Sequence, residues 1–199
     1  MVTHGQEALT QKALTQPACV AAGGLREQDT AAQTKQIEAL LEASNQGPAK
    51  WTIVVGHHAV RSYGRHCAPA APGAINDCQA MAWLGPLLQK HGVQLYLNGH
   101  DHDMQHIKFP NETTHFVTSG GGGDFRPGEF DGLDKPHAQF LADDLGFALV
   151  EVEEDLMTVT LFVRRSGSQP AHVVQIWAGK EGGKVRRGLW GMSRRNTML

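Results

Sequence analysis

The chain has 199 residues, about the length of one domain, and apolar residues make up 41% of it. This apolar content suffices for a packed core and excludes a disordered chain. The formal net charge of −2 gives no basic surface, and no apolar run approaches the roughly 20 residues of a transmembrane helix. We therefore expect neither a nucleic acid nor a membrane as a partner. Eleven histidines are the one feature of the composition that favours metal chemistry.

The predicted elements begin with an irregular segment, because residues 1–30 show no reliable apolar period. A helix follows at 31–44, with Asp29 or Thr30 as the candidate N-cap. Residues 51–55 form a short β-branched apolar run that ends in Gly56-His57-His58 and is typical of a buried strand. The sequence next predicts a loop at 59–77, a helix at 78–90 kinked by Pro86, and a strand at 93–97. Together with the strand at 51–55 they form a βαβ crossover, so the two strands should be parallel.

The second half of the sequence predicts further strands. They are expected at 114–118, before the glycine run 120–123 and a loop to about 145, then in a hairpin of 147–152 and 156–163, and finally at 173–177. We thus expect an α/β domain with a mixed sheet over residues 31–178. Residues 179–199 contain six basic groups and one acidic group, which predicts a solvated or disordered basic tail.

The cysteines leave the redox compartment open. The chain has three, Cys19, Cys67 and Cys78, too few to define a disulfide framework. A Cys67–Cys78 bridge would close a short loop in an oxidising compartment, and two unpaired buried thiols are an equally good interpretation. Asn111-Glu112-Thr113 matches a glycosylation sequon, and the first residues lack the pattern of a signal peptide.

Histidines follow both strands of the predicted crossover. Because parallel strands end at the same edge of a sheet, His57 and His100 should leave the sheet about 5–10 Å apart. His102 lies two residues beyond His100, so in an extended chain its side chain would point to the same side. Imidazole suits ions such as zinc and iron better than calcium or magnesium. We therefore predict a metal site formed by His57, His100 and His102.

These residues resemble the last two signature motifs of the calcineurin-like metallophosphoesterases. The Gly-His-His after Trp-Thr-Ile-Val-Val and the Gly-His-Asp-His after Val-Gln-Leu-Tyr-Leu-Asn carry the resemblance. The helix Gln-Ile-Glu-Ala-Leu-Leu-Glu-Ala-Ser and the later Thr-Ser-Gly-Gly-Gly are similar to the purple, tartrate-resistant acid phosphatase branch. The resemblance covers about residues 30–165 and corresponds to the carboxyl-terminal half of the family's domain. It implies half of a four-layer α/β/β/α sandwich.

The resemblance also implies a chemistry. Complete family members hydrolyse phosphomonoesters at a dinuclear centre of iron with zinc, iron or manganese. By motif position, His57 and His100 would bind the second, divalent ion and His102 the first, ferric ion. His66 lies where the acid phosphatases have a histidine that can protonate the leaving oxygen. His58 and His106 are expected to line the pocket without binding metal. The family suggests a secreted, vacuolar or lysosomal setting.

The first three motifs of the family, which contribute a G-D, a G-D-x-x-Y and a G-N-H, do not occur in this sequence. Three neutral imidazoles carry no charge to oppose the repulsion between two metal ions. We therefore expect this chain alone to bind at most one ion such as zinc, and its activity alone is in doubt. We also expect an exposed sheet face to promote self-association.

Two functions from different classes follow. The first is a metal-dependent phosphomonoester hydrolase of the acid phosphatase type. The alternative is a non-catalytic metal-binding or pseudo-enzyme fragment, and a mononuclear three-histidine hydrolase is a third reading.

Overall fold

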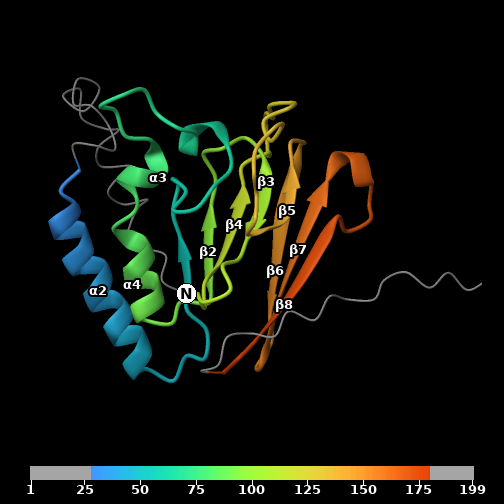
Figure 1. Cartoon of the computed structure of the whole chain (residues 1–199). Coiled ribbons are helices and arrows are strands. Elements are labelled where there is room, and N and C mark those ends of the chain that lie inside the picture. The colour runs from blue at the N-terminus through green and yellow to red at the C-terminus, as the bar shows by residue number, and fades with distance from the viewer. Residues whose placement is uncertain (1–27, 180–199) are drawn as a thin grey trace, which may run out of the picture.

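The computed structural model describes residues 28–179 (Figure 1). Most of the irregular segment predicted for 1–30 and of the basic tail predicted for 179–199 lies outside the described residues. Between residues 28 and 179, no helix has both the length and the apolar character needed to cross a membrane.

The helices lie close to their predicted positions, with one break. α2 spans Thr30–Gln46 and starts at Asp29, whose carboxylate accepts the Ala32 N–H at 2.9 Å. The helix predicted for 78–90 is divided into α3 (Asp77–Ala80) and α4 (Leu84–Lys90). Pro86 therefore lies in the first turn of α4, where the missing N–H costs no helical hydrogen bond, and it does not kink a longer helix.

Five strands form a mixed sheet in the order β1-β2-β4-β3-β5. Its strands are β1 (Ile53–Val55), β2 (Leu95–Asn98), β3 (Met104–Ile107), β4 (His115–Ser119) and β5 (Ala138–Ala142). β2 is parallel to both β1 and β4, which confirms the βαβ crossover. β3 pairs antiparallel with β4 and β5. Strands β3 and β5 were absent from the sequence prediction.

Three antiparallel strands form a second sheet, in the order β6-β7-β8. The hairpin of β6 (Gly146–Val152) and β7 (Leu156–Val163) and the last strand β8 (His172–Trp177) confirm the three predicted strands. Two short 3-10 helices, η3 (Arg65–Cys67) and η4 (Arg164–Ser166), complete the described elements.

The described elements stack in three layers, with α2 and α4 on one face of the five-stranded sheet and the second sheet on the other (Figure 1). Leu41, Leu84 and Leu88 of the helices pack against Tyr96 and Phe116 of the sheet in one fully buried core cluster. A second cluster joins the opposite face of this sheet to β7 and β8, through Leu95, Val117, Met157, Leu161 and Val174. This arrangement agrees with the expected α/β class and with a metallophosphoesterase fold.

Most of the large apolar side chains left exposed among the described residues lie on the second sheet, and several of them are on its outer face. Phe147 and Leu149 of β6 are 58% and 43% exposed, and Trp177 of β8 is 45% exposed. Their neighbours Ala148, Val150 and Ile176 point inward and pack in the second cluster, as strand alternation requires. The two inner faces cover each other, so the apolar face available for self-association is this outer one.

Candidate metal centre

The ends of β1 and β2 bring two predicted ligands together. The strands pair in register from Ile53–Leu95 to Val55–Leu97, and the ladder continues with the Gly56 N–H on the Leu97 carbonyl at 2.9 Å. The next bond runs from the Gly99 N–H to the His57 carbonyl at 3.2 Å. As a result, His57 Nε2 lies 3.0 Å from His100 Nδ1.

His58 completes a cluster of three imidazoles. One ring nitrogen each of His57, His58 and His100 lies within 4.8 Å of the others. Nitrogens bound to one tetrahedral zinc at 2.0–2.1 Å are about 3.3 Å apart, so a small adjustment of the rings accommodates such an ion. His57 is exposed and the other two are half-buried, which leaves the cluster open to solvent. The donor set therefore fits one zinc-like ion.

His102 occupies a different place. Its Nδ1 lies 3.1 Å from Asp124 Oδ2, and both side chains are solvent-exposed. The structure thus brings together two of the three predicted ligands, His57 and His100, with His58 as the third imidazole of the cluster. The assignment of His57, His100 and His102 as metal ligands stays a prediction.

The conformation of His100 is held by its neighbours. Its φ of 68° lies in the left-handed region, and it is the one such non-glycine residue between positions 28 and 179. His100 Nε2 lies 2.9 Å from Asp77 Oδ2, so the ring donates its Nε2–H to the carboxylate. The Nδ1 lone pair then faces the cluster, in the carboxylate–histidine–metal pattern. Asp77 was not predicted, because the sequence placed it in a loop.

The local environment favours the neutral form of His58 and His100. Burial, together with the nearby His100 and His57, lowers the pKa of His58 to about 4. Burial also lowers the pKa of His100, helped by the charge of His66 and opposed by the Asp77 hydrogen bond. Neutral imidazole is the form that binds metal, so both shifts reduce the competition of protons with an ion.

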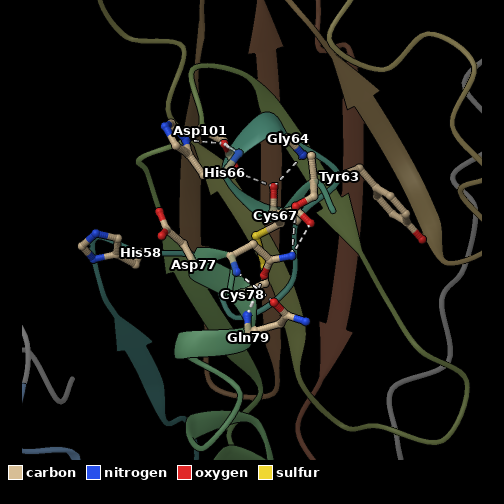
Figure 2. Close-up of a disulfide and its surroundings, with 12 residues drawn as sticks. His58, Tyr63, Gly64, His66, Cys67, Asp77, Cys78, Gln79 and Asp101 are labelled. Carbon is tan, nitrogen blue, oxygen red and sulfur yellow. Dashed lines mark hydrogen bonds and ion pairs between the residues drawn. A yellow bond between two sulfur atoms is a disulfide. The ribbon is translucent and has the colours of Figure 1, made fainter. Parts of the chain in front are cut away.

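His66 lies beside the cluster and is held by a buried carboxylate (Figure 2). Its Nδ1 and its backbone N–H contact Asp101 Oδ1 at 2.7 and 3.2 Å, and its ring centroid is 4.1 Å from that of His100. Asp101 Oδ2 accepts the Ser62 hydroxyl at 2.5 Å. Gly64 is required here, since a Cβ at this position would lie 2.3 Å from Asp101 Cγ. The structure therefore places His66 beside the imidazole cluster, and its role as a proton donor stays a prediction.

A disulfide joins Cys67 and Cys78 (Figure 2). The sequence left open whether these cysteines form a bridge or stay unpaired, and the structure has the bridge. Each cysteine directly follows a residue of the site, because His66 precedes Cys67 and Asp77 precedes Cys78. The bridge therefore fixes the η3 segment to α3 next to the imidazole cluster.

Two further features belong to the surroundings of the site. Gly120 donates its N–H to the Asp103 carbonyl at 3.0 Å, and a Cβ on Gly120 would lie 1.8 Å from the Asp101 carbonyl oxygen. The glycine run thus packs the end of β4 against the loop between β2 and β3. His106 does not line the pocket, because it is buried on β3 between His115 and His172, 2.9 Å from each.

Comparisons with known proteins agree with this geometry. The family model described as calcineurin-like phosphoesterase matches residues 8–104. Purple acid phosphatase 3 of Arabidopsis thaliana is 35% identical over 121 residues, which are 60% of this chain and 31% of that protein. Human tartrate-resistant acid phosphatase type 5 is 32% identical over 123 residues, 59% of this chain and 35% of that protein. The chain spans about a third of the length of these relatives.

A solved structure has the same fold. The purple acid phosphatase isolated from yellow lupin (Lupinus luteus) seeds aligns with a TM-score of 0.57 at 20% identity, over 73% of this chain and 28% of that chain. Motifs and relatives therefore agree: the chain is similar to the calcineurin-like phosphoesterases over residues 8–104 and to purple acid phosphatases over about 60% of its length.

Proposed function

We propose that the chain carries part of the site of a metal-dependent phosphomonoester hydrolase of the acid phosphatase type. The observation that supports this most directly is the cluster of His57, His58 and His100 beside the His66–Asp101 pair. Metal ligands and a candidate proton donor then lie on the same sheet edge, as hydrolysis of a phosphoester needs. The names of the acid phosphatase relatives support the substrate class.

The chain's own residues have distinct roles in this proposal. His57, His58 and His100 would hold the ion, which when bound supplies positive charge for the phosphate oxygens and a more acidic water. Asp77 orients His100 by accepting its Nε2–H. Asp101 holds His66 through Nδ1, which leaves His66 Nε2 to give a proton to the departing ester oxygen.

The number of ions distinguishes the two candidate functions. Among the described residues, the cluster contains three imidazoles and no carboxylate, so it offers no negative bridge between two cations. Iron with zinc, iron or manganese, as expected for complete relatives, would need further ligands. One ion per chain without turnover would favour the second candidate, a non-catalytic metal-binding protein. The disulfide supports a secreted or lysosomal setting in either case.

The test is hydrolysis of p-nitrophenyl phosphate by the purified chain after reconstitution with zinc or iron. We expect His66→Asn to lower kcat by about 10²–10⁴-fold while the bound metal is retained. His57→Asn should lower both metal content and turnover. His137→Asn, which changes a histidine packed on Phe109, is the matched control and should change neither. Absence of turnover in the metal-loaded wild-type chain would refute the hydrolase proposal for this chain.

A further inference from the structure

A second group of potential ligands lies behind His66, and it consists of carboxylates. One oxygen each of Asp101, Asp103 and Glu129 lies within 4.8 Å of the others. Asp101 and Asp103 belong to the loop between β2 and β3 and are 0% exposed. Glu129 comes from the loop between β4 and β5, and its side chain is 4% exposed. We refer to these three residues as the carboxylate cluster.

Only some of the carboxylate oxygens in the cluster accept a hydrogen bond. Asp103 Oδ1 accepts Gln105 Nε2–H at 2.8 Å, and Glu129 Oε1 accepts the Arg65 N–H at 2.7 Å. The second oxygen of each, Asp103 Oδ2 and Glu129 Oε2, is buried and has no hydrogen-bond donor. A buried carboxylate oxygen without a donor loses its hydration without compensation. Two such oxygens in one cluster therefore point to a missing cationic partner.

The charges point the same way. Arg126 is the cation nearest to Glu129 in the described ion pairs, with Nη1 4.0 Å from Glu129 Oε1. Three carboxylates and one guanidinium would carry a charge of −2 with all four groups ionised and His66 neutral. Burial, with the nearby Asp101 and Glu129, raises the pKa of Asp103 to about 8, because this charge is unfavourable without a cation. Arg126 Nη1 is itself buried without a hydrogen bond, so it does not satisfy the free oxygens. A divalent cation would balance this charge.

We propose that Asp101, Asp103 and Glu129 form a calcium site separate from the imidazole cluster. Calcium takes oxygen ligands at 2.3–2.6 Å, so oxygens on opposite sides of the ion are up to about 5 Å apart. The cluster offers only carboxylate oxygens, all within 4.8 Å of one another, and calcium accepts such donors in flexible arrangements, whereas magnesium demands near-ideal octahedral geometry at 2.0–2.1 Å. Imidazole is a poor ligand for calcium, which separates the two sites chemically.

A cation here would connect three segments around the candidate metal centre. Asp101 and Asp103 flank His102 on the loop that also carries His100, and Glu129 contacts the backbone of Arg65, next to His66. The ion would therefore fix the β4–β5 loop against the segment that holds His66. Its role is to position this segment, and it takes no part in proton transfer.

The experiment is calorimetric titration of the metal-depleted full chain with calcium chloride, combined with thermal melts at 0 and 1 mM calcium. We expect one calcium per chain with a Kd between about 1 µM and 1 mM, and a rise in Tm of a few degrees. Asp103→Asn and Glu129→Gln keep the side-chain volume and the oxygens that accept from Gln105 and Arg65. Each should weaken binding at least tenfold and remove most of the Tm rise.

Two controls separate this proposal from others. Glu42→Gln changes an exposed acid of α2 that lies near Glu38 and His91. This variant should bind calcium as the wild type does. His57→Asn should also leave calcium uptake unchanged, although it lowers metal binding at the imidazole cluster. The proposal is overturned if the wild type takes up no calcium at 1 mM. That result would mean that a proton neutralises the carboxylate cluster. Uptake that is unchanged in both Asp103→Asn and Glu129→Gln overturns the proposal as well.

Discussion

Removal of the Asp77 carboxylate tests how the imidazole cluster is organised. Asp77 Oδ2 accepts the Nε2–H of His100 at 2.9 Å, and this bond selects the tautomer whose Nδ1 lone pair faces His57. Losing such a partner of a metal-binding histidine costs 10–100-fold in metal affinity, or about 1.4–2.7 kcal/mol. Asp77→Asn retains an acceptor but loses the charge, so we expect about tenfold, and Asp77→Ala should approach 100-fold.

The assay is a competition titration of zinc against a chromophoric chelator at pH 7, with thermal melts to show that each variant is folded. Asp134→Asn, which changes an exposed aspartate of the β4–β5 loop, is the control and should retain wild-type affinity. If Asp77→Ala binds zinc as tightly as the wild type while remaining folded, Asp77 does not orient His100. The carboxylate–histidine–metal interpretation would then be wrong.

Three further predictions concern stability and association. Replacing Cys67 and Cys78 by serine removes a bridge across an 11-residue separation and should cost about 3 kcal/mol in urea unfolding, and an unchanged midpoint would contradict this. Burial lowers the pKa of His115 from 6.5 to about 3, so the unfolded chain binds its proton first as the pH falls. Stability should therefore decrease from pH 8 to pH 5 by about 2 kcal/mol from this residue, and His115→Asn should reduce that slope. The outer face of the second sheet should cause self-association in light scattering, which Phe147→Asp together with Leu149→Lys should reduce; a monomeric wild type would refute it.

The part of the fold that the sequence predicted well is the part with clear apolar patterns. The strand ending at Val55 and the strand ending at Asn98 are short apolar runs followed at once by Gly-His, and a helical stripe lies between them. These patterns determine the parallel pair, and the pair determines that His57 and His100 meet. Their proximity follows from topology, whereas the 3.0 Å between their ring nitrogens also depends on the backbone conformation of His100 and its contact with Asp77.

The missed strands lack such a pattern. β3 (Met104–Ile107) is buried at all four positions and includes Gln105 and His106, so neither alternation nor an apolar run marks it. β5 (Ala138–Ala142) follows a loop rich in glycine, proline and aspartate, which dominates its surroundings in the sequence. β3 is stabilised by pairing with β4, and β5 by pairing with β3, rather than by the strand preference of their own residues.

The partners of the histidines were missed for another reason. His102 was expected beside His100 because an extended chain would direct both side chains to one side. The backbone instead turns at His100, whose φ is 68°, and His102 contacts Asp124. Asp77 and Asp101 could be found only from tertiary structure, since no local pattern links an aspartate to a histidine 23 or 35 residues away.

The disulfide connects these unpredicted partners. His66 and Asp77 each precede a bridged cysteine, so the covalent link limits the movement of the proton donor relative to the carboxylate that orients His100. The η3 segment has only three residues and no side-chain N-cap, so little of its order comes from helix formation. Without the bridge, the backbone around His66 would depend on side-chain contacts, such as those of Asp101 with Ser62 and His66 and of Glu129 with Arg65. Reduction should therefore impair the placement of His66 more than the parallel strand ends that carry His57 and His100, which are held by the sheet ladder.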